Sequence, residues 1–242
     1  MKKAILFSSI FAIGAAVAVD SDNAIGVTTV GLTGKGAQKL VAVPFAGYGD
    51  GDVKVSDLVS PSGLKAGSKL YVATAKGYAV WSLSTDGGDW APVNIVSIQN
   101  RSTVEEASFE ADSVTVKRGD AFWLEPADAD ESATIAYLLG QKPEKPGEGT
   151  VSATGGKWNL VSNPLLTVGT FTGAVAGDVI YIQGADGAQV RCQMVKEMVN
   201  EKEVWNWKYR AANGEVVTAT FAPGDGFWFY PKADRTLTWS AK

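Results

Sequence analysis

The sequence uses one short phrase twice, and this repetition constrains the fold more than any other feature. The first copy, residues 119–126, reads Gly-Asp-Ala-Phe-Trp-Leu-Glu-Pro, and the second, residues 224–231, reads Gly-Asp-Gly-Phe-Trp-Phe-Tyr-Pro. In each copy a turn-forming Gly-Asp pair leads into an aromatic segment that favours a strand. A proline ends the segment because it cannot donate a hydrogen bond to a strand ladder. The phrase therefore predicts the same turn and strand at two places in the chain.

Other matched segments occur in the same order around both copies. Residues 40–45 match 160–165, residues 66–72 match 176–182, and residues 134–137 match 236–239. The number of residues that separates each segment from its match falls along the chain, so the first copy carries the longer loops. Such extra loop residues cost little closure entropy. We interpret the pattern as two tandem, internally duplicated β-sandwich or barrel-like lobes, 19–139 and 150–242.

The fold class that these segments predict is all-β. The strands are short, rich in Val, Thr, Ile and aromatic residues, and bounded by Gly, Asp and Pro. No segment keeps a helical period beyond a few turns, although residues 55–59 could form one turn with Ser56 as its cap. Residues 140–149, Gly-Gln-Lys-Pro-Glu-Lys-Pro-Gly-Glu-Gly, offer no apolar face and are expected to be a Pro/Gly linker between the lobes.

The N-terminus has the pattern of a secretory signal peptide, which we assign to residues 1–18. Lys2 and Lys3 precede an apolar stretch too short to cross a bilayer, and Ala16-Val17-Ala18 supplies a small-residue cleavage site. We therefore expect an exported protein, extracellular, at the cell surface or periplasmic, with no membrane span in the mature chain. The alternative is an N-terminal anchor that is never cleaved.

Composition argues against several classes of function. The chain has no histidine, which removes Ser-His-Asp and Cys-His catalysis and most zinc sites. No two acids are paired by the sequence as a glycosidase would need, so we expect no enzyme, and a hydrolase is the least favoured class. The net charge is −4 with no basic cluster, which disfavours a nucleic-acid partner. Cys192 stands alone, and we favour a buried thiol over an exposed one.

Acidic loop residues provide a weak case for calcium. Asp50, Asp52 and Asp57 could offer carboxylate oxygens, and Asp86 with Asp89 poses the same case. The spacing lacks the ligand pattern of an EF-hand, and Gly-Asp pairs are common in turns for conformational reasons alone. We therefore expect no cofactor.

Eight tryptophans make the aromatic residues the main candidates for a site. Trp90, Trp158 and Trp205 lie near turns or strand ends, where exposed rings could stack on sugars. In the hairpin expected over 189–209, Trp205 shares one face with Trp207 and Tyr209. Trp123 and Trp228 hold equivalent places in the repeated phrase, and we expect both in the cores.

Residues 157–164, Lys-Trp-Asn-Leu-Val-Ser-Asn-Pro, and residues 223–231, which contain the second phrase, resemble a recurrent bacterial pattern. Uncharacterised exported β proteins carry a GWNLVSNP opening and a PGxGFWxY closing phrase. The likeness covers most of the second lobe and, more weakly, the first, where Gln38-Lys39 replaces Trp-Asn and Arg118 precedes Gly119 in place of Pro. The resemblance implies a structural repeat and brings no catalytic residue with it.

Together these features predict a non-enzymatic exported protein of the surface or envelope, acting through structural assembly or adhesion. Its expected partners are copies of itself or other surface proteins. The alternative is a carbohydrate-binding protein that uses exposed Trp and Tyr platforms, with polysaccharide as its partner.

Overall fold

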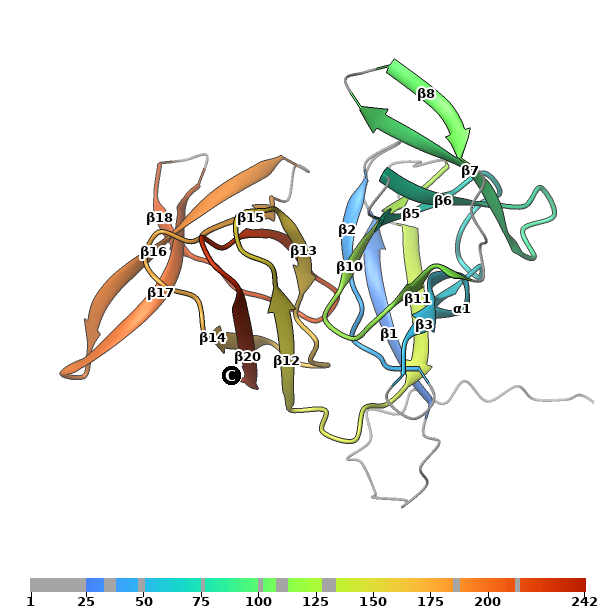
Figure 1. Cartoon of the computed structure of the whole chain (residues 1–242). Coiled ribbons are helices and arrows are strands. Elements are labelled where there is room, and N and C mark those ends of the chain that lie inside the picture. Colours follow the sequence, from blue (N-terminus) through green and yellow to red (C-terminus); the bar gives the residue numbers. More distant parts are fainter. Residues whose placement is uncertain are drawn as a thin grey trace, which may run out of the picture.

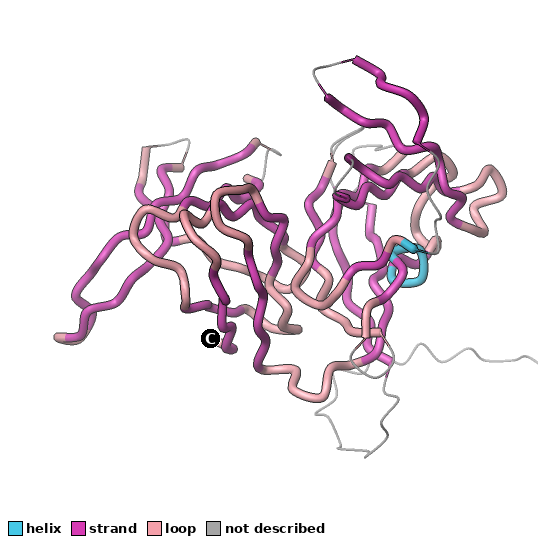
Figure 2. The backbone as a smooth tube through the Cα atoms, in the orientation of Figure 1, coloured by secondary structure: helices cyan, strands magenta, loops and turns pink. Residues whose placement is uncertain are grey.

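A computed structural model describes residues 25–32, 38–47, 51–74, 77–99, 102–107, 113–127, 134–184, 188–211 and 214–242. These residues form antiparallel sheets almost throughout, with one short helix (Figure 2). None of the sheets closes on itself. The expected all-β class is therefore confirmed. The expected signal peptide, 1–18, lies outside the described residues.

The strands fall into an N-terminal half and a C-terminal half (Figure 1). The elements of the N-terminal half are β1 (Ile25–Leu32), β2 (Lys39–Ala42), β3 (Val53–Lys54), α1 (Val55–Leu58), β4 (Val59–Ser60), β5 (Lys69–Thr74), β6 (Gly77–Leu83), β7 (Trp90–Gln99), β8 (Ser102–Ala107), β9 (Thr115–Val116), β10 (Ala121–Glu125) and β11 (Thr134–Gln141). Those of the C-terminal half are β12 (Glu148–Ala153), β13 (Asn159–Ser162), β14 (Gly169–Thr172), β15 (Val179–Gln183), β16 (Gln189–Val199), β17 (Lys202–Arg210), β18 (Val216–Thr218), β19 (Gly226–Tyr230) and β20 (Arg235–Ala241).

The two halves have the same strand order. Each half contains a three-stranded sheet, β1-β11-β4 or β12-β20-β14. Each also contains a six-stranded sheet, β2-β10-β5-β6-β7-β8 or β13-β19-β15-β16-β17-β18. The small β3-β9 pair is an addition of the N-terminal half within the described residues.

The register of the strands matches as well as their order. Trp123 lies opposite Leu40 on one side and Tyr71 on the other. In the C-terminal half, Trp228 lies opposite Leu160 and Tyr181, which are the residues at the matching places. A shift by one residue would move every side chain to the other face of the sheet, so a shared register means shared faces.

A hydrophobic core fills each half between its two sheets. The N-terminal core joins Leu32 of β1 and Leu138 of β11 to Phe122 and Leu124 of β10. In the C-terminal core, Trp239 of β20 packs with Phe227 and Phe229 of β19. Cys192 is 1% exposed and belongs to this core, which confirms the expected buried thiol.

The halves contact each other in a reciprocal way. The Ala42 backbone N–H donates to Gly224 O at 3.0 Å, and the Ser162 N–H donates to Gly119 O at 2.8 Å. Ala42 and Ser162 are matched residues of β2 and β13, and the two glycines open the two copies of the repeated phrase. Each Gly-Asp turn therefore rests on the edge strand of the other half, as in an isologous two-fold interface.

The connection between the halves is shorter than the expected linker, 140–149. Strand β11 continues to Gln141 and β12 begins at Glu148, so only residues 142–147 lie between the strands. Arg118 holds this connection: its Nη2 donates to Lys145 O at 3.1 Å and to Glu148 O at 2.8 Å. Its Nε donates to Pro164 O at 2.8 Å. Arg118 therefore joins the connection to both halves.

The single helix differs in detail from the expected turn at 55–59. It ends at Leu58, and its N-cap is Lys54, which makes no side-chain capping bond. Ser56 is therefore inside the helix and does not cap it. Val55 and Leu58 are buried, so packing against the core stabilises this turn in place of a cap.

Candidate functional site

The three tryptophans expected to be exposed lie in different surroundings. Trp90 is half-buried, packs against the N-terminal core, and its indole N–H donates to Val59 O at 2.8 Å. Trp158 is 46% exposed and Trp205 is 51% exposed. Trp158 and Trp205 therefore keep ring surface open to solvent, whereas most of Trp90 is committed to packing.

Trp123 and Trp228 do not lie in the cores, and this prediction was wrong. Both are half-buried on the outward face of their six-stranded sheet, while their neighbours Phe122 and Phe227 are fully buried. The signal for this arrangement was present in the first copy of the phrase. Side chains alternate along a strand, so Trp123 shares its face with Glu125, whose carboxylate favours the solvent side.

On the C-terminal half, Trp228 is part of an aromatic cluster. The Trp158 ring lies 5.4 Å from that of Tyr181, 6.4 Å from that of Trp228 and 5.1 Å from that of Tyr230, measured between centroids. It meets Tyr181 at 64° and Trp228 at 83°. Because the rings meet at steep angles, they form the walls of a corner and do not cover each other.

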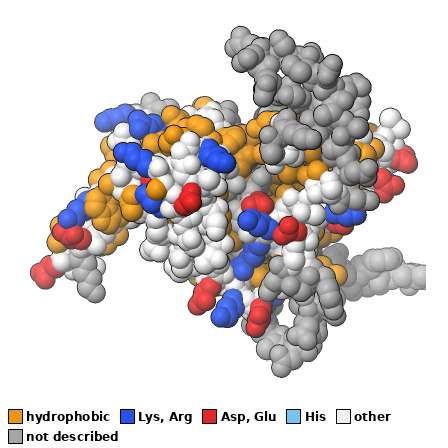
Figure 3. Space-filling model, viewed as in Figure 1, with side chains coloured by type: hydrophobic (Ala, Val, Ile, Leu, Met, Phe, Trp, Pro, Cys, Tyr) orange, Lys and Arg blue, Asp and Glu red, His pale blue; other side chains and the backbone are white. Residues whose placement is uncertain are grey.

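Beside this corner lies a shallow, open apolar hollow of about 330 Å³, lined by Trp158, Tyr181, Gln189 and Trp228. We call it the aromatic hollow. Its volume is at the lower end of the range for small-molecule sites. In Figure 3, hydrophobic side chains gather along the upper edge of the molecule over β13 and β15, beside Lys and Arg side chains over β16 to β18.

The side chain of Asn159 fixes the turn that carries Trp158. The Asn159 side-chain amide donates to Thr154 O at 3.0 Å and to Lys157 O at 2.9 Å, and its oxygen accepts from the Thr154 N–H at 2.9 Å. These bonds close the turn before β13. The position of Trp158 at the end of that turn is therefore held by its neighbour in the sequence.

Along β16, Gln189 lines the aromatic hollow, and further polar side chains follow it on the outward face. Gln189, Arg191 and Gln193 alternate with core residues and are exposed on the outward face, with Arg191 directly opposite Tyr181. Among the residues that the structure describes, none makes a side-chain hydrogen bond or ion pair with these three. Their donors and acceptors are therefore open to a ligand.

The matching place in the N-terminal half is filled by polar contacts. Glu125 stands where the C-terminal half has Tyr230, and Gln38 stands where it has Trp158. Tyr71 Oη donates to Glu125 Oε2 at 2.8 Å, and Gln38 Nε2 donates to the same oxygen at 2.9 Å. Burial, followed by the bond to Glu125, raises the pKa of Tyr71. This face is therefore a hydrogen-bonded surface without the aromatic corner.

Trp205 lies on a second exposed feature, the outer part of the β16–β17 hairpin, residues 193–207, which we call the arm. It projects beyond the rest of the C-terminal half (Figure 1). Asn200 and Glu201 both have positive φ, 49° and 64°, which is the geometry of a two-residue hairpin turn. Trp205 and Trp207 share one face, as expected, but Trp207 reaches the core and Trp205 does not.

Those of the predicted acidic residues that the structure describes do not come together as a calcium site. Asp50 lies outside the described residues, Asp52 accepts from the Thr115 hydroxyl at 3.1 Å, and Asp57 is in the exposed part of α1. Asp86 accepts from the Ser84 hydroxyl and from the Gly88 N–H of its own turn. No group of three or more metal-ligating side chains occurs in the part of the chain that the structure describes.

Comparison of the chain with protein-family models, with curated proteins and with solved structures found no match. Over the described ranges, no helix has the length and apolar character that a membrane span requires. The chemistry of the aromatic hollow therefore has to be derived from its own residues.

Proposed function

We propose that this chain is a non-enzymatic, exported protein of the cell surface or envelope that acts by adhesion, with carbohydrate bound in the aromatic hollow. The observation that carries this proposal is the corner of Trp158, Tyr181 and Trp228, beside Gln and Arg side chains that have no partner among the residues the structure describes. A pyranose ring presents C–H groups on its faces and hydroxyls at its rim. The negative face of an aromatic ring attracts the C–H groups, and amides and guanidinium bind the hydroxyls.

We further infer that the two halves are two lobes of sandwich type that arose by tandem duplication, joined by the connection at 142–147. Their equal strand order, equal register and reciprocal Gly-Asp contacts support this inference. After duplication, replacement of side chains on one outward face would separate the roles of the lobes. The C-terminal lobe would bind, and the N-terminal lobe would support it.

The test is a titration of Trp fluorescence with soluble polysaccharides such as laminarin, xyloglucan and polygalacturonate. We expect a saturable shift with at least one of them, and Trp158→Ala should weaken that binding at least about tenfold, the effect of about 1.4 kcal/mol. Trp205→Ala is the matched control, because Trp205 is equally exposed but lies on the arm. A flat titration with all three, or equal losses in the two variants, contradicts the proposal.

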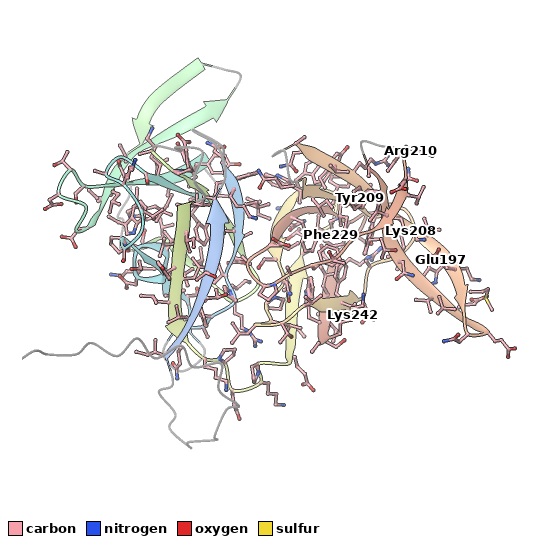
Figure 4. All side chains as sticks on the ribbon, turned by 180° about the vertical axis from the view of Figure 1, so that it is seen from behind. Glu197, Lys208, Tyr209, Arg210, Phe229 and Lys242 are labelled. Atoms are coloured by element: carbon pink, nitrogen blue, oxygen red, sulfur yellow. The ribbon has the colours of Figure 1, made fainter. Side chains whose placement is uncertain are left out.

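Structural assembly is a second candidate function, favoured by the arm. It exposes apolar side chains on both of its faces, Val195, Val199 and Val204 on one and Met198 and Trp205 on the other. Exposed apolar surface of this kind marks interaction surfaces. Its charges are balanced within the hairpin: Lys196 Nζ lies 2.6 Å from Glu203 Oε1, and Lys208 is paired with Glu197 (Figure 4). A second copy of the arm would therefore meet little charge repulsion.

The edges of the arm favour the same partner. Strand β15 pairs with β16 only up to Cys192, and β18 pairs with β17 only from Lys208 onward. The backbone along the outer edges of the arm thus has no strand beside it among the described residues, and open edges are templates for further pairing.

Light scattering coupled to size-exclusion chromatography tests assembly. We expect the mass of the protein to rise with concentration, and the double substitution Met198→Ser with Trp205→Ser to lower it to that of a monomer. Ile25→Ser is the control, because Ile25 is 78% exposed on β1, far from the arm in the chain. Runs with and without calcium show whether the cation contributes. A monomer at every concentration would exclude assembly through the arm.

A further inference from the structure

We infer that the polysaccharide bound in the aromatic hollow is anionic, and that Arg191 binds a carboxylate of the sugar whose ring stacks on the tryptophans. This inference rests on the proposed function and names the class of ligand. It starts from the position of Arg191, which lies opposite Tyr181 in the register of β15 and β16. Side chains of directly opposed residues project from the same face, about 5 Å apart at Cβ. Arg191 therefore starts from the same face of the sheet beside Tyr181, which lines the hollow.

The guanidinium of Arg191 is available for a ligand. Arg191 is exposed, and no described residue forms a hydrogen bond or ion pair with its side chain. Its planar fork of donors matches the two oxygens of a carboxylate, and such bidentate pairs are shorter and stronger than neutral hydrogen bonds. Gln189 and Gln193, on either side along β16, can bind the hydroxyls of the same or the next sugar.

The outward face around Arg191 is positive, although the chain as a whole carries a charge of −4. Lys157 is exposed beside Trp158. Lys208 lies opposite Gln193 in the register of β16 and β17, but its charge is offset by its ion pair with Glu197. Arg210 follows Lys208 on the same face of β17, and both are labelled in Figure 4. Positive side chains gathered on one face attract an anionic polymer.

Around Arg191 itself, acidic side chains do not cancel this charge in the described part of the face. Outward positions of β13, β15 and β19, and of β16 as far as Gln193, carry neither Asp nor Glu. Glu197 lies on the same face of β16 but six residues from Arg191, about 20 Å along a strand. That separation exceeds the Debye length of about 8 Å at physiological salt. Glu197 therefore offsets the charge of Lys208, with which it is paired, and leaves that of Arg191.

The N-terminal half supplies an internal comparison. Its outward face places Glu125 at the position of Tyr230, and this carboxylate already accepts bonds from Tyr71 and Gln38. A bound carboxylate there would face another negative charge. The inference therefore assigns the anionic ligand to the C-terminal face alone.

The experiment compares polygalacturonate with its fully methyl-esterified form, which keeps the sugar ring and loses the charge. We expect the protein to bind polygalacturonate at least tenfold more tightly than the ester in low salt. Arg191→Gln should reduce the affinity for polygalacturonate to that for the ester and leave binding of the ester unchanged. Lys142→Gln, an exposed lysine of the connection, controls for the change in net charge.

The outcomes separate this inference from the proposed function. Equal affinity for the two polymers, with loss of both on Trp158→Ala, would overturn the anionic ligand and leave carbohydrate binding in place. Binding of polygalacturonate that survives Trp158→Ala would contradict both. Equal binding of poly-glutamate would show that charge alone is recognised, and equal binding of dextran sulfate would show that the anion need not be a carboxylate. Either result overturns the inference as stated.

Discussion

Asp120 and Asp225 occupy the same position in the two copies of the repeated phrase and make the same hydrogen bond. Asp120 Oδ2 accepts from the Lys117 N–H at 2.9 Å, and Asp225 Oδ2 accepts from the Ala222 N–H at 3.2 Å. Both residues adjoin the contact between the halves, where Asp120 forms a bridge with Val161 and Asp225 with Val41. Burial raises the pKa of both carboxyls above the ordinary value of 3.8.

This pair predicts a pH dependence of stability. Because the pKa of each carboxyl is higher in the folded than in the unfolded protein, the folded protein binds more protons. The contribution of the two carboxyls to the free energy of unfolding therefore falls as pH rises above about 3.8. Asp120→Asn with Asp225→Asn should remove that fall. The effect is limited because the Asp225 side chain is 42% exposed and lies 3.8 Å from Lys39.

Urea unfolding at a series of pH values, comparing the double variant with the parent, measures the difference. The comparison is needed because the pKa values of Asp86 and Glu197 are lowered, chiefly by side-chain hydrogen bonds from Ser84 and Lys208, and act in the opposite direction. Asp57→Asn is an exposed control. Parallel pH profiles for the parent and the double variant would show that the raised pKa values do not affect folding.

The glycines before these aspartates predict a graded cost of substitution. Gly119 has φ of 95° and Gly224 of 87°, where a side chain is strained. A Cβ on Gly119 would also lie 2.4 Å from Val151 Cγ2 of the other half, whereas one on Gly224 would lie 3.2 Å from Val30 Cγ2. We expect Gly119→Ala to destabilise by more than Gly224→Ala, which should cost about 1–3 kcal/mol.

Gly156→Ala is the matched control for these glycines. Its φ is 72°, but a Cβ there would meet nothing within 4 Å, so it measures backbone strain alone. The expected order of destabilisation in thermal or urea unfolding is Gly119, Gly224, then Gly156. If all three variants lose equal stability, the close approach of the halves at Gly119 makes no contribution.

Adjacent residues of β19 should respond very differently to truncation. Phe227 is fully buried among Phe171, Phe221 and Trp239, so Phe227→Ala should cost about 3–5 kcal/mol. Trp228→Ala removes a larger side chain but opens no core cavity, and we expect less than half of that loss. Urea midpoints give the comparison, and a larger loss for Trp228 would place its ring in the core after all.

The thiol of Cys192 should be unreactive in the folded protein. It is 1% exposed, and burial raises its pKa to about 12, so very little thiolate exists at neutral pH. A disulfide reagent at pH 8 should label it only at the rate of unfolding, and the rate should follow the denaturant concentration. Rapid labelling without denaturant would contradict the burial of this residue.

The sequence by itself determined the strand class, the two equivalent phrases and the burial of Cys192. These depend on short-range properties: turn residues, strand propensity and alternation are set by neighbours in the chain. Alternation also contained the correct orientation of Trp123, through Glu125 two residues later. The prediction that Trp123 lies in the core relied on the size of its side chain, which was a weaker criterion than strand alternation.

Only the tertiary structure decided which residues meet at the aromatic hollow. Trp158, Tyr181 and Trp228 come from three segments that are adjacent only because β13, β19 and β15 are neighbours in one sheet. A strand pattern defines two faces but neither its partners nor the face that the second sheet covers. The partners of a strand and its buried face depend on packing between residues far apart in the chain. The reciprocal contact between the two halves depends on such packing as well.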